Sequence, residues 1–413
     1  MGRPEIRFKG YTDEWEQRKF GEITELKSAS RVHKDEWTSN GVPFYRSSDV
    51  MAAINGTENE KAFISEELYE KLSKVSGKLE EGDILVTGGG SVGNPYIVPD
   101  NKSLYTKDAD LLWIKNKGKF HPYFLYEFFF SPTFRNYLES ISHVGTIAHY
   151  TITQLSDTPI CLPSFEEQKE VGEYFQSLDH LITLHQRKCD EVKSLKKYML
   201  QKMFPQNEQK IPEIRFEGFT EAWEQRKLGD TSEKVCVGFV GTCEKYYTDE
   251  TGIPMYRTGN LNGLSLNKDD MKYVTRDFHQ QNKKSQLKFG DILIARHGDS
   301  GKAVNYESSE EANCLNIVII RPDFKKCNYR FLTDCINSPR CQKHIKSLSA
   351  GSTQAVINTS EIEKLEVLLP GSIDEQEKVA AYFENLDHLI TLHQQKCEEL
   401  KKIKKFMLQK MFV

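Results

Sequence analysis

No stretch of this 413-residue sequence is apolar for long enough to span a membrane as a helix, which takes about eighteen or more such residues in a row. The first ten residues, MGRPEIRFKG, lack the apolar core of a secretory signal. The nine cysteines include no Cys-x-x-Cys pair, so neither a zinc site nor a disulfide framework is indicated. We therefore predict a cytoplasmic protein with no membrane partner, whose cysteines are reduced and structural.

The sequence also lacks an excess of positive charge. Its formal net charge is −4, which argues against a protein that coats nucleic acid non-specifically but leaves room for local basic patches. Basic stretches occur at residues 187–202, 272–302 and 396–410. A chain of 413 residues is too long to fold around one ordinary hydrophobic core, so two or more domains are expected.

Motifs for catalysis are missing or incomplete. GGGSVGNP at 88–95 lacks the Lys-Ser/Thr ending of a phosphate-binding loop, and GDSGKA at 298–303 lacks the first glycine at the required spacing. NPYI at 94–97 resembles the Asn-Pro-Pro-aromatic loop of adenine N6-methyltransferases, but one proline and the cofactor motif are absent. We predict no catalytic residue and no cofactor bound by this chain. The glycine-rich turns are either tight turns or places where DNA or a ligand approaches the backbone closely.

What the sequence does contain is a tandem duplication with a period close to 208 residues. PEIRFKGYTDEWEQRKFGE at 4–22 returns as PEIRFEGFTEAWEQRKLGD at 212–230, and LDHLITLHQ recurs without a difference at 178–186 and 386–394. The opening strip and the closing segment are nearly identical, whereas the long stretch between them shares only short anchors. The constant parts therefore perform the same task twice, and the variable parts perform different versions of one task.

The variable parts predict mixed α/β domains. GDILVT at 82–87 and GDILIA at 290–295 are typical of a turn followed by a strand. Residues 121–140 and 327–348 predict helices, each interrupted by a Ser-Pro pair. The order of the strands is not predicted by these patterns. The fold class is accordingly α/β (α+β), in two tandem copies joined by long helices.

The closing segments, at 166–204 and 374–412, are predicted to be long helices. Apolar residues recur in each at alternating steps of three and four, which places them on one stripe. A long helix with one apolar stripe needs a partner, and two such helices in one chain most simply pack on each other. The predicted seam includes Leu178, Ile182, His185 and Leu195 of the first helix, and Leu386, Ile390, His393 and Ile403 of the second.

The two histidines of the repeated stretch raise the alternative of a metal site. His180 and His185 are five residues apart, so about 140° separates them around a helix and they cannot readily bind one ion. We therefore predict no metal and place His185 on the seam.

The doubled order of motifs resembles the specificity subunit of type I restriction–modification systems. The residues that carry the resemblance are Trp15 to Gly21 with Trp223 to Gly229, the GDIL turns, the EEQ and DEQ helix starts at 166–168 and 374–376, and the LQKMF helix ends. The resemblance covers nearly the whole chain. It divides the chain into a target-recognition domain at 1–162, a central helix at 163–204, a linker at 205–212, a second target-recognition domain at 213–370 and a C-terminal helix at 371–413.

The resemblance implies a role in sequence-specific recognition of double-stranded DNA. Each target-recognition domain would recognise one half of a bipartite site, and the helices would pair as an antiparallel coiled coil that sets the spacer. The helices would also dock methyltransferase subunits, two of them, that hold S-adenosylmethionine and methylate adenine N6. Restriction subunits driven by ATP, with Mg²⁺, would complete an assembly in which this chain is not itself an enzyme.

Polar side chains that follow the predicted strands are the candidates for DNA contact, because base edges in the major groove are bound by Arg, Lys, Asn, Gln, Ser and Thr. Lys283 and Lys284 are expected to contact phosphates, which position without specifying sequence. The remaining candidates are Arg46, Ser47, Ser48, Thr87, Ser91, Thr146, His149 and Tyr150 in the first copy, and Arg257, Thr258, Asn260, Arg296, His297, Lys302, Ser352, Thr353 and Gln354 in the second.

Two alternatives stay open from the sequence. One is a self-sufficient DNA methyltransferase or nuclease whose site has no recognisable motif. The other is a coiled-coil scaffold that binds protein partners and makes no contact with DNA.

Overall fold

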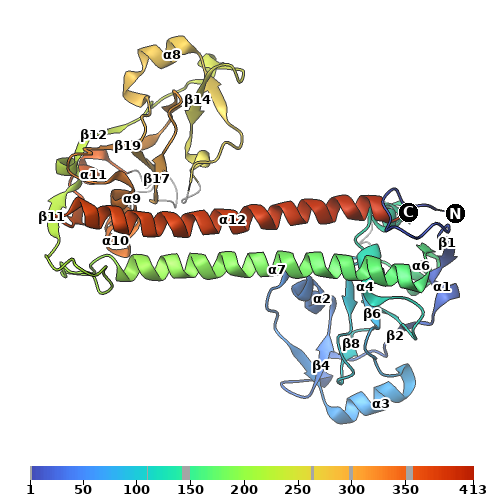
Figure 1. The fold of residues 1–413 in the computed structure, drawn as a ribbon. Coiled ribbons are helices and arrows are strands. Elements are labelled where there is room, and N and C mark those ends of the chain that lie inside the picture. The colour runs from blue at the N-terminus through green and yellow to red at the C-terminus, as the bar shows by residue number, and fades with distance from the viewer. Residues whose placement is uncertain (1, 109, 142–148, 262–264, 297–300, 350–356) are drawn as a thin grey trace. The chain divides into compact units, whose positions relative to one another are not determined.

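The computed structural model describes residues 2–108, 110–141, 149–261, 265–296, 301–349 and 357–413 (Figure 1). The chain forms two compact units: the first unit is Met1–His185 with Gln395–Val413, and the second unit is Gln186–Gln394. Each unit contains one variable part together with one half of each of two long helices, α7 (Phe165–Lys202) and α12 (Ile373–Met411). The two long helices expected from the apolar periodicity are thus confirmed. No helix of the described residues has the length and apolar character needed to cross a bilayer.

The variable part of the first unit contains two four-stranded sheets. One has the order β2 (Leu26–Ser28), β9 (Leu111–Ile114), β6 (Ile84–Thr87), β7 (Pro95–Ile97), and all its pairs are antiparallel. The other has the order β3 (Trp37–Thr38), β5 (Ala62–Ile64), β4 (Val42–Tyr45), β8 (Tyr105–Thr106), with β4 and β8 parallel. A separate ribbon pairs β1 (Glu16–Lys19) with β10 (Pro159–Leu162).

Short helices complete the first unit. They are α1 (Phe20–Ile23), η1 (Lys34–Glu36), α2 (Ser47–Asn55), α3 (Glu66–Ser76), α4 (Pro122–Phe128), α5 (Pro132–Ile141) and α6 (Ile152–Asp157). The predicted Ser-Pro break falls between α4 and α5, where Ser131 accepts a hydrogen bond from Phe134 N at 3.3 Å. Proline suits the first turn of a helix because its missing N–H would have no partner there.

The second unit repeats this topology. Its sheets have the orders β12 (Ser232–Val237), β19 (Ile317–Pro322), β16 (Asp291–Ala295), β17 (Ala303–Tyr306), and β13 (Tyr247–Thr248), β15 (Lys272–Val274), β14 (Ile253–Tyr256), β18 (Asn313–Cys314). Its ribbon pairs β11 (Glu224–Lys227) with β20 (Glu366–Leu369). Its helices are η2 (Leu228–Thr231), η3 (Glu244–Tyr246), η4 (Thr258–Asn260), α8 (Arg276–Gln281), η5 (Lys283–Ser285), α9 (Tyr329–Asn337), α10 (Pro339–Ser349) and α11 (Thr359–Glu363). The mixed helix-and-sheet class expected for both copies is confirmed.

The nearly identical opening strip packs on the start of each long helix. In the first unit the guanidinium of Arg7 donates to the buried carboxylate of Glu167 at 2.6 and 2.8 Å, and Trp15 Nε1 donates to it at 3.3 Å. The next residue, Gln168, accepts from His121 N at 3.1 Å and donates to Pro163 O at 3.0 Å. The buried side chains of Glu167 and Gln168 therefore both have hydrogen-bond partners, as buried polar groups require.

The second unit builds the same frame from equivalent residues. Arg215 and Trp223 donate to Glu375 at distances of 2.7, 2.8 and 3.2 Å, and Gln376 accepts from Asn328 N at 2.8 Å. These contacts explain why the arginine and tryptophan of the opening strip and the Glu-Gln helix starts recur unchanged. They constitute the shared frame, which holds each variable part on its long helix.

The long helices run antiparallel within each unit. Residues later in α7 contact residues earlier in α12. In the first unit Ile182 O accepts from Cys397 Sγ at 3.9 Å, and Asp179 pairs with Lys404. In the second unit Cys189 Sγ lies 3.9 Å from Ile390 O, and Lys196 pairs with Asp387. Among the expected seam residues, Leu178, Leu386 and Ile390 are buried, and Ile182, His185 and His393 are half-buried.

The seam prediction is wrong at Leu195 and Ile403. These side chains are 43% and 42% exposed, whereas their neighbours Lys196 and Lys404 turn inward. The reason is electrostatic: each ammonium group forms a short ion pair with an aspartate of the other helix, and that pair takes the position which the apolar pattern assigns to a leucine or isoleucine.

Candidate nucleic-acid interface

Three of the predicted contact segments meet at one end of β6 in the first unit. Gly88 N donates to Asp110 O at 2.8 Å, and Tyr150 N donates to Gly88 O at 2.8 Å. Ser47 Oγ also donates to Asp110 O, at 3.1 Å. The loop after β4, the glycine-rich turn after β6 and the segment before α6 are therefore joined around Gly88 and Asp110. We call this cluster the loop edge of the first unit.

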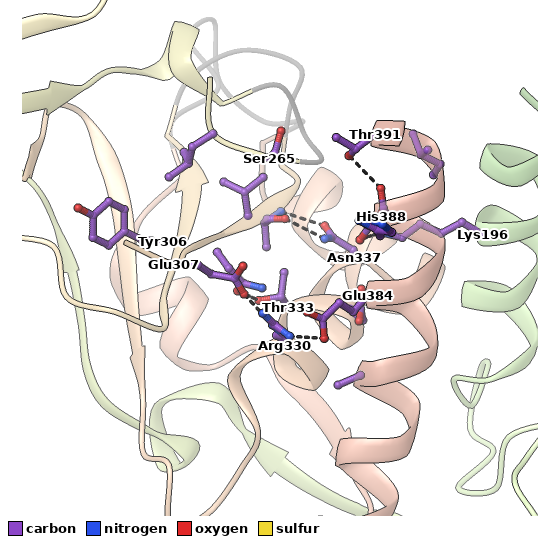
Figure 2. A pocket seen from close by; sticks show the side chains of 18 of the residues that line it. Lys196, Ser265, Tyr306, Glu307, Arg330, Thr333, Asn337, Glu384, His388 and Thr391 are labelled. Atoms are coloured by element: carbon purple, nitrogen blue, oxygen red, sulfur yellow. Dashed lines mark hydrogen bonds and ion pairs between the residues drawn. The ribbon is translucent and has the colours of Figure 1, made fainter. Parts of the chain in front are cut away.

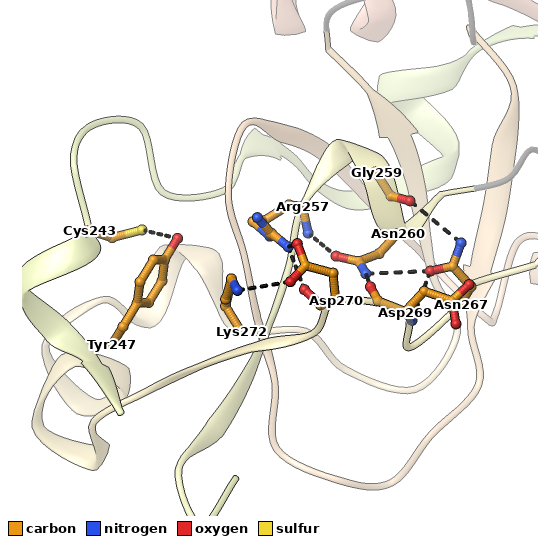
Figure 3. A network of polar contacts seen from close by, with 9 residues as sticks. All are labelled: Cys243, Tyr247, Arg257, Gly259, Asn260, Asn267, Asp269, Asp270 and Lys272. Carbon is orange, nitrogen blue, oxygen red and sulfur yellow. Dashed lines mark hydrogen bonds and ion pairs between the residues drawn. The ribbon is translucent and has the colours of Figure 1, made fainter. Parts of the chain in front are cut away.

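The second unit has an equivalent arrangement at the end of β16. Ile357 N donates to Arg296 O at 3.2 Å, which matches the contact between Tyr150 and Gly88. The turn after β14 is closed by Asn260, whose Oδ1 accepts from Arg257 N at 2.9 Å (Figure 3). In the first unit Asp49 closes the corresponding turn by accepting from Arg46 N at 2.8 Å. The two loop edges thus share their backbone design but differ in their side chains.

Several predicted contact residues are accessible at or near these loops. Ser48, Ser91 and His149 are exposed in the first unit, and Lys283, Lys284 and Lys302 are exposed in the second. Ser47, Thr258 and Arg296 are half-buried, and Nε of Arg296 has no hydrogen-bond partner among the described residues. Thr146, His297, Ser352, Thr353 and Gln354 lie outside the described residues.

Three predicted contact residues are buried, so the prediction of DNA contact does not hold for them in this structure. The Thr87 hydroxyl donates to Ser91 O and accepts from Asn94 N, which closes the glycine-rich turn. The Tyr150 hydroxyl bonds to the Thr158 hydroxyl inside the core. Asn260 Nδ2 donates to Asp269 O at 3.0 Å. Each polar group is buried and bonded within its own domain, which keeps it away from a base.

Two predicted arginines are already ion-paired within their own domains. Arg46 Nε donates to Asp49 Oδ2 at 2.9 Å, and its guanidinium lies 5.5 Å from the ring centre of Trp37. Arg257 donates to Asp270 at 2.9 Å (Figure 3). Hydrogen bonds from Lys272 and from Arg257 lower the pKa of Asp270 to about 2. Each arginine therefore already donates part of its guanidinium to a carboxylate of its own domain.

The loop edge of the first unit also contains residues that the sequence did not suggest. Lys107 pairs with Asp110, and the exposed Arg31 lies 3.6 Å from Asp108. Lys107 and both aspartates belong to the β8–β9 connection, whose Asp110 accepts from Gly88 N, and Asp108 brings Arg31 to that connection. Among the described residues no group of three or more His, Cys, Asp and Glu side chains could hold a metal ion.

The shared frame and the loop edge, each present once in each unit, are the features that identify the protein family. The chain matches the type I restriction modification DNA specificity domain twice, at residues 12–194 and 220–402. It therefore belongs to that family, with two copies of the domain in one chain.

Individual relatives agree with this assignment. The type I restriction enzyme MjaVIII specificity subunit of Methanocaldococcus jannaschii is 23% identical over 356 residues, which are 83% of this chain and 82% of the relative. The EcoBI specificity subunit of Escherichia coli is 22% identical over 58% of this chain and 54% of its own length. The S subunit of M. genitalium has a similar fold, with a TM-score of 0.65 at 15% identity and 99% of each chain covered. A chain from a study of type I R-M complex assembly and conformational transition has a TM-score of 0.56, with 16% identity and 96% and 97% coverage.

Proposed function

We propose that this chain is the specificity subunit of a type I restriction–modification complex and that it recognises a bipartite sequence in double-stranded DNA. In this proposal the variable part of each unit recognises one half of the site through its loop edge. The observation that carries the proposal is the repeated architecture. One frame is built twice from the same contacts, and it carries two different sets of loop side chains at the same sheet end.

We propose further that the chain is not itself catalytic. Its relatives are named specificity subunits. Catalysis would be supplied by methyltransferase subunits that hold S-adenosylmethionine and methylate adenine N6, and by restriction subunits that use ATP and Mg²⁺. The long helices would set the unrecognised spacer between the half-sites, as dimer geometry sets half-site spacing in other DNA-binding proteins.

Exposed apolar side chains on the long helices support the docking of two identical partner subunits. Leu195 and Tyr198 of α7 are 43% and 51% exposed, and they are neighbours on the helix surface because they are three residues apart. Ile403 and Phe406 occupy the equivalent positions on α12 and are 42% and 50% exposed. A pair of large apolar side chains left in water is typical of a binding surface. The recurrence of an apolar and an aromatic side chain at the equivalent positions of both units is expected if each pair contacts the same partner.

Mapping adenine methylation in cells that express this chain with its methyltransferase subunit tests the proposal. The expected result is modified adenines confined to one two-part motif with a fixed gap. Exchanging residues 22–160 for the corresponding block of a relative should change one half of that motif and leave the other half and the gap unchanged. Methylation at scattered sites, or at a continuous motif, would contradict the proposal. The purified chain alone should modify or cleave no DNA when given S-adenosylmethionine or Mg²⁺.

A further inference from the structure

A polar cavity of about 740 Å³ lies within the second unit, between its variable part and the first half of α12 (Figure 2). Its volume falls in the range of roughly 300–1,000 Å³ that is usual for ligand-binding pockets. Side chains from β17, α9 and α12 line it, and Lys196 reaches into it from α7. The lining residues that carry the following argument are Arg330, Thr333, Asp334, Asn337, Glu384 and Asp387.

Asp334 is the unusual member of this lining. Asp334 is only 7% exposed. Its carboxylate nevertheless accepts no hydrogen bond from, and forms no ion pair with, any residue that the structure describes. Burial raises the pKa of Asp334 to about 8. A buried carboxylate normally has donors around it, because losing its hydration without replacement is unfavourable. Asp334 therefore faces the cavity with no hydrogen-bond partner among the described residues.

The first unit shows what the same position binds when its partner is present. The residue equivalent to Asp334 is Glu127, and its Oε1 accepts a hydrogen bond from the Lys404 ammonium at 2.9 Å. That ammonium also pairs with Asp179 at 2.6 and 2.7 Å. In the second unit Lys196 makes the same double contact with Asp387, at 2.6 and 2.7 Å. Aspartate is one methylene shorter than glutamate, and Lys196 donates nothing to Asp334.

The side chains around this position are also smaller in the second unit than in the first. The positions equivalent to Thr333 and Asn337 carry Tyr126 and Phe130 in the first unit, and these two rings pack with their centres 5.1 Å apart. Lys404 lies 5.8 Å from the centre of the Phe130 ring. The second unit thus has small polar groups where the first has two aromatic rings. Such a replacement leaves space whose walls can form hydrogen bonds.

We propose that this cavity binds a primary ammonium group, which donates to Asp334 from the cavity side as the Lys404 ammonium donates to Glu127. The charges of the lining fit a cation. Arg330 is shared by Glu307 and Glu384, and Lys196 is taken by Asp387. Asp334 is then the one lining carboxylate that forms no ion pair among the residues that the structure describes. The ligand class is a short aliphatic amine, either a free diamine or the side chain of a lysine supplied by another protein.

Calorimetric titration of the full chain with 1,4-diaminobutane and, separately, with Nα-acetyl-lysine methylamide tests this proposal. Titration with KCl at matched ionic strength measures the non-specific background. We expect saturable binding of at least one of the two amines above that background. Tighter binding of the diamine indicates a free amine as the natural ligand, and tighter binding of the lysine derivative indicates a protein side chain. Binding of neither amine overturns the proposal.

Variants of the cavity separate a specific site from surface attraction. Asp334→Asn should weaken amine binding by about tenfold or more, because a charge-assisted hydrogen bond is lost. Asp334→Glu keeps the charge but should also abolish binding, because the longer side chain reaches Lys196 as Glu127 reaches Lys404. Thr333→Tyr with Asn337→Phe should do the same by filling the cavity. Glu127→Gln is the matched control in the first unit and should bind amines as the natural chain does. Unchanged affinity in both Asp334 variants would overturn the proposal even if the chain binds amines.

Discussion

Lys404 donates two hydrogen bonds to Asp179, at 2.6 and 2.7 Å, and thereby joins the C-terminal half of α12 to the N-terminal half of α7 within the first unit. The same ammonium donates to Glu127 of α4 at 2.9 Å, so one lysine connects both long helices to the variable part. An apolar residue could fill the same volume. It could not fix both the register of the two helices and the position of α4, because only the ammonium must lie within hydrogen-bond distance of Asp179 and Glu127 together.

Removing this ammonium should destabilise the chain. Lys404→Ala leaves Glu127 buried without its donor, which is expected to lower the free energy of unfolding by about 1–3 kcal/mol. Lys402→Ala, at an exposed position of the same helix, is the matched control and should change it by less than about 0.5 kcal/mol. Urea denaturation measures both. In a double-mutant cycle with Glu127→Gln, additive effects would show that the contact contributes nothing.

Stability should also depend on pH through Glu127. Burial raises the pKa of this carboxyl to about 8, although Lys404 opposes the shift. Because the folded-state pKa lies above the ordinary value of 4.5, the folded chain holds this proton more tightly than the unfolded chain. The contribution of protonated Glu127 to the free energy of unfolding is therefore fully present below about pH 4.5 and is lost as the pH rises towards 8. Urea denaturation across this range should show a decline that is smaller in Glu127→Gln. Equal slopes for the two proteins would contradict the assignment.

Neighbouring residues of the loop edge should separate stability from recognition. Thr87→Val removes a buried hydroxyl with two hydrogen bonds and is expected to lower the free energy of unfolding by about 1–2 kcal/mol, without altering the methylated sequence. His149→Ala removes an exposed side chain. It should leave stability within about 0.5 kcal/mol and relax one half of the methylated motif. Thermal unfolding and methylation mapping of both variants check this contrast. A changed motif in Thr87→Val with intact recognition in His149→Ala would reverse the assignment.

The exposed apolar pairs should control how many methyltransferase subunits bind. Replacing Leu195 and Tyr198 by serine should weaken the binding of one partner copy by at least about tenfold, because large apolar anchors dominate interfaces. Replacing Ile403 and Phe406 by serine should affect the other copy equally. Native mass spectrometry at limiting concentration should then show one bound methyltransferase for each variant and none for the combination. Lys197→Ser and Lys405→Ser, at exposed neighbouring positions, are the controls. Two bound copies in the combined variant would exclude these pairs from the interface.

Periodicity predicted the helices because a single apolar stripe leaves few arrangements for them. It failed at Leu195 and Ile403, where the ion pairs of Lys196 and Lys404 determine which face turns inward. The order of the strands was beyond prediction, since β4 and β8 pair residues as far apart as Phe44 and Tyr105. Their contact is fixed by the packing of the whole domain and has no local signal.

The candidate interface was predictable as a place but not as a set of side chains. Hydroxyl and amide groups after strands indicated turns that the fold does bring together, yet the residue type does not say which way a side chain points. Thr87, Tyr150 and Asn260 use their polar groups inside the domain. Asp110 organises the loop edge of the first unit through its backbone carbonyl, a group that every residue possesses and no sequence pattern can mark.

The loop edge has buried and exposed residues within a few positions of each other along the chain. His149 is exposed and Tyr150 is buried, and in the glycine-rich turn the buried Thr87 is followed shortly by the exposed Ser91. Two kinds of position therefore lie close together in the sequence. Substitution at the buried positions destabilises the domain, and substitution at the exposed positions changes its stability little. In the proposed function, single substitutions at the exposed positions would therefore change the DNA target at little cost in stability.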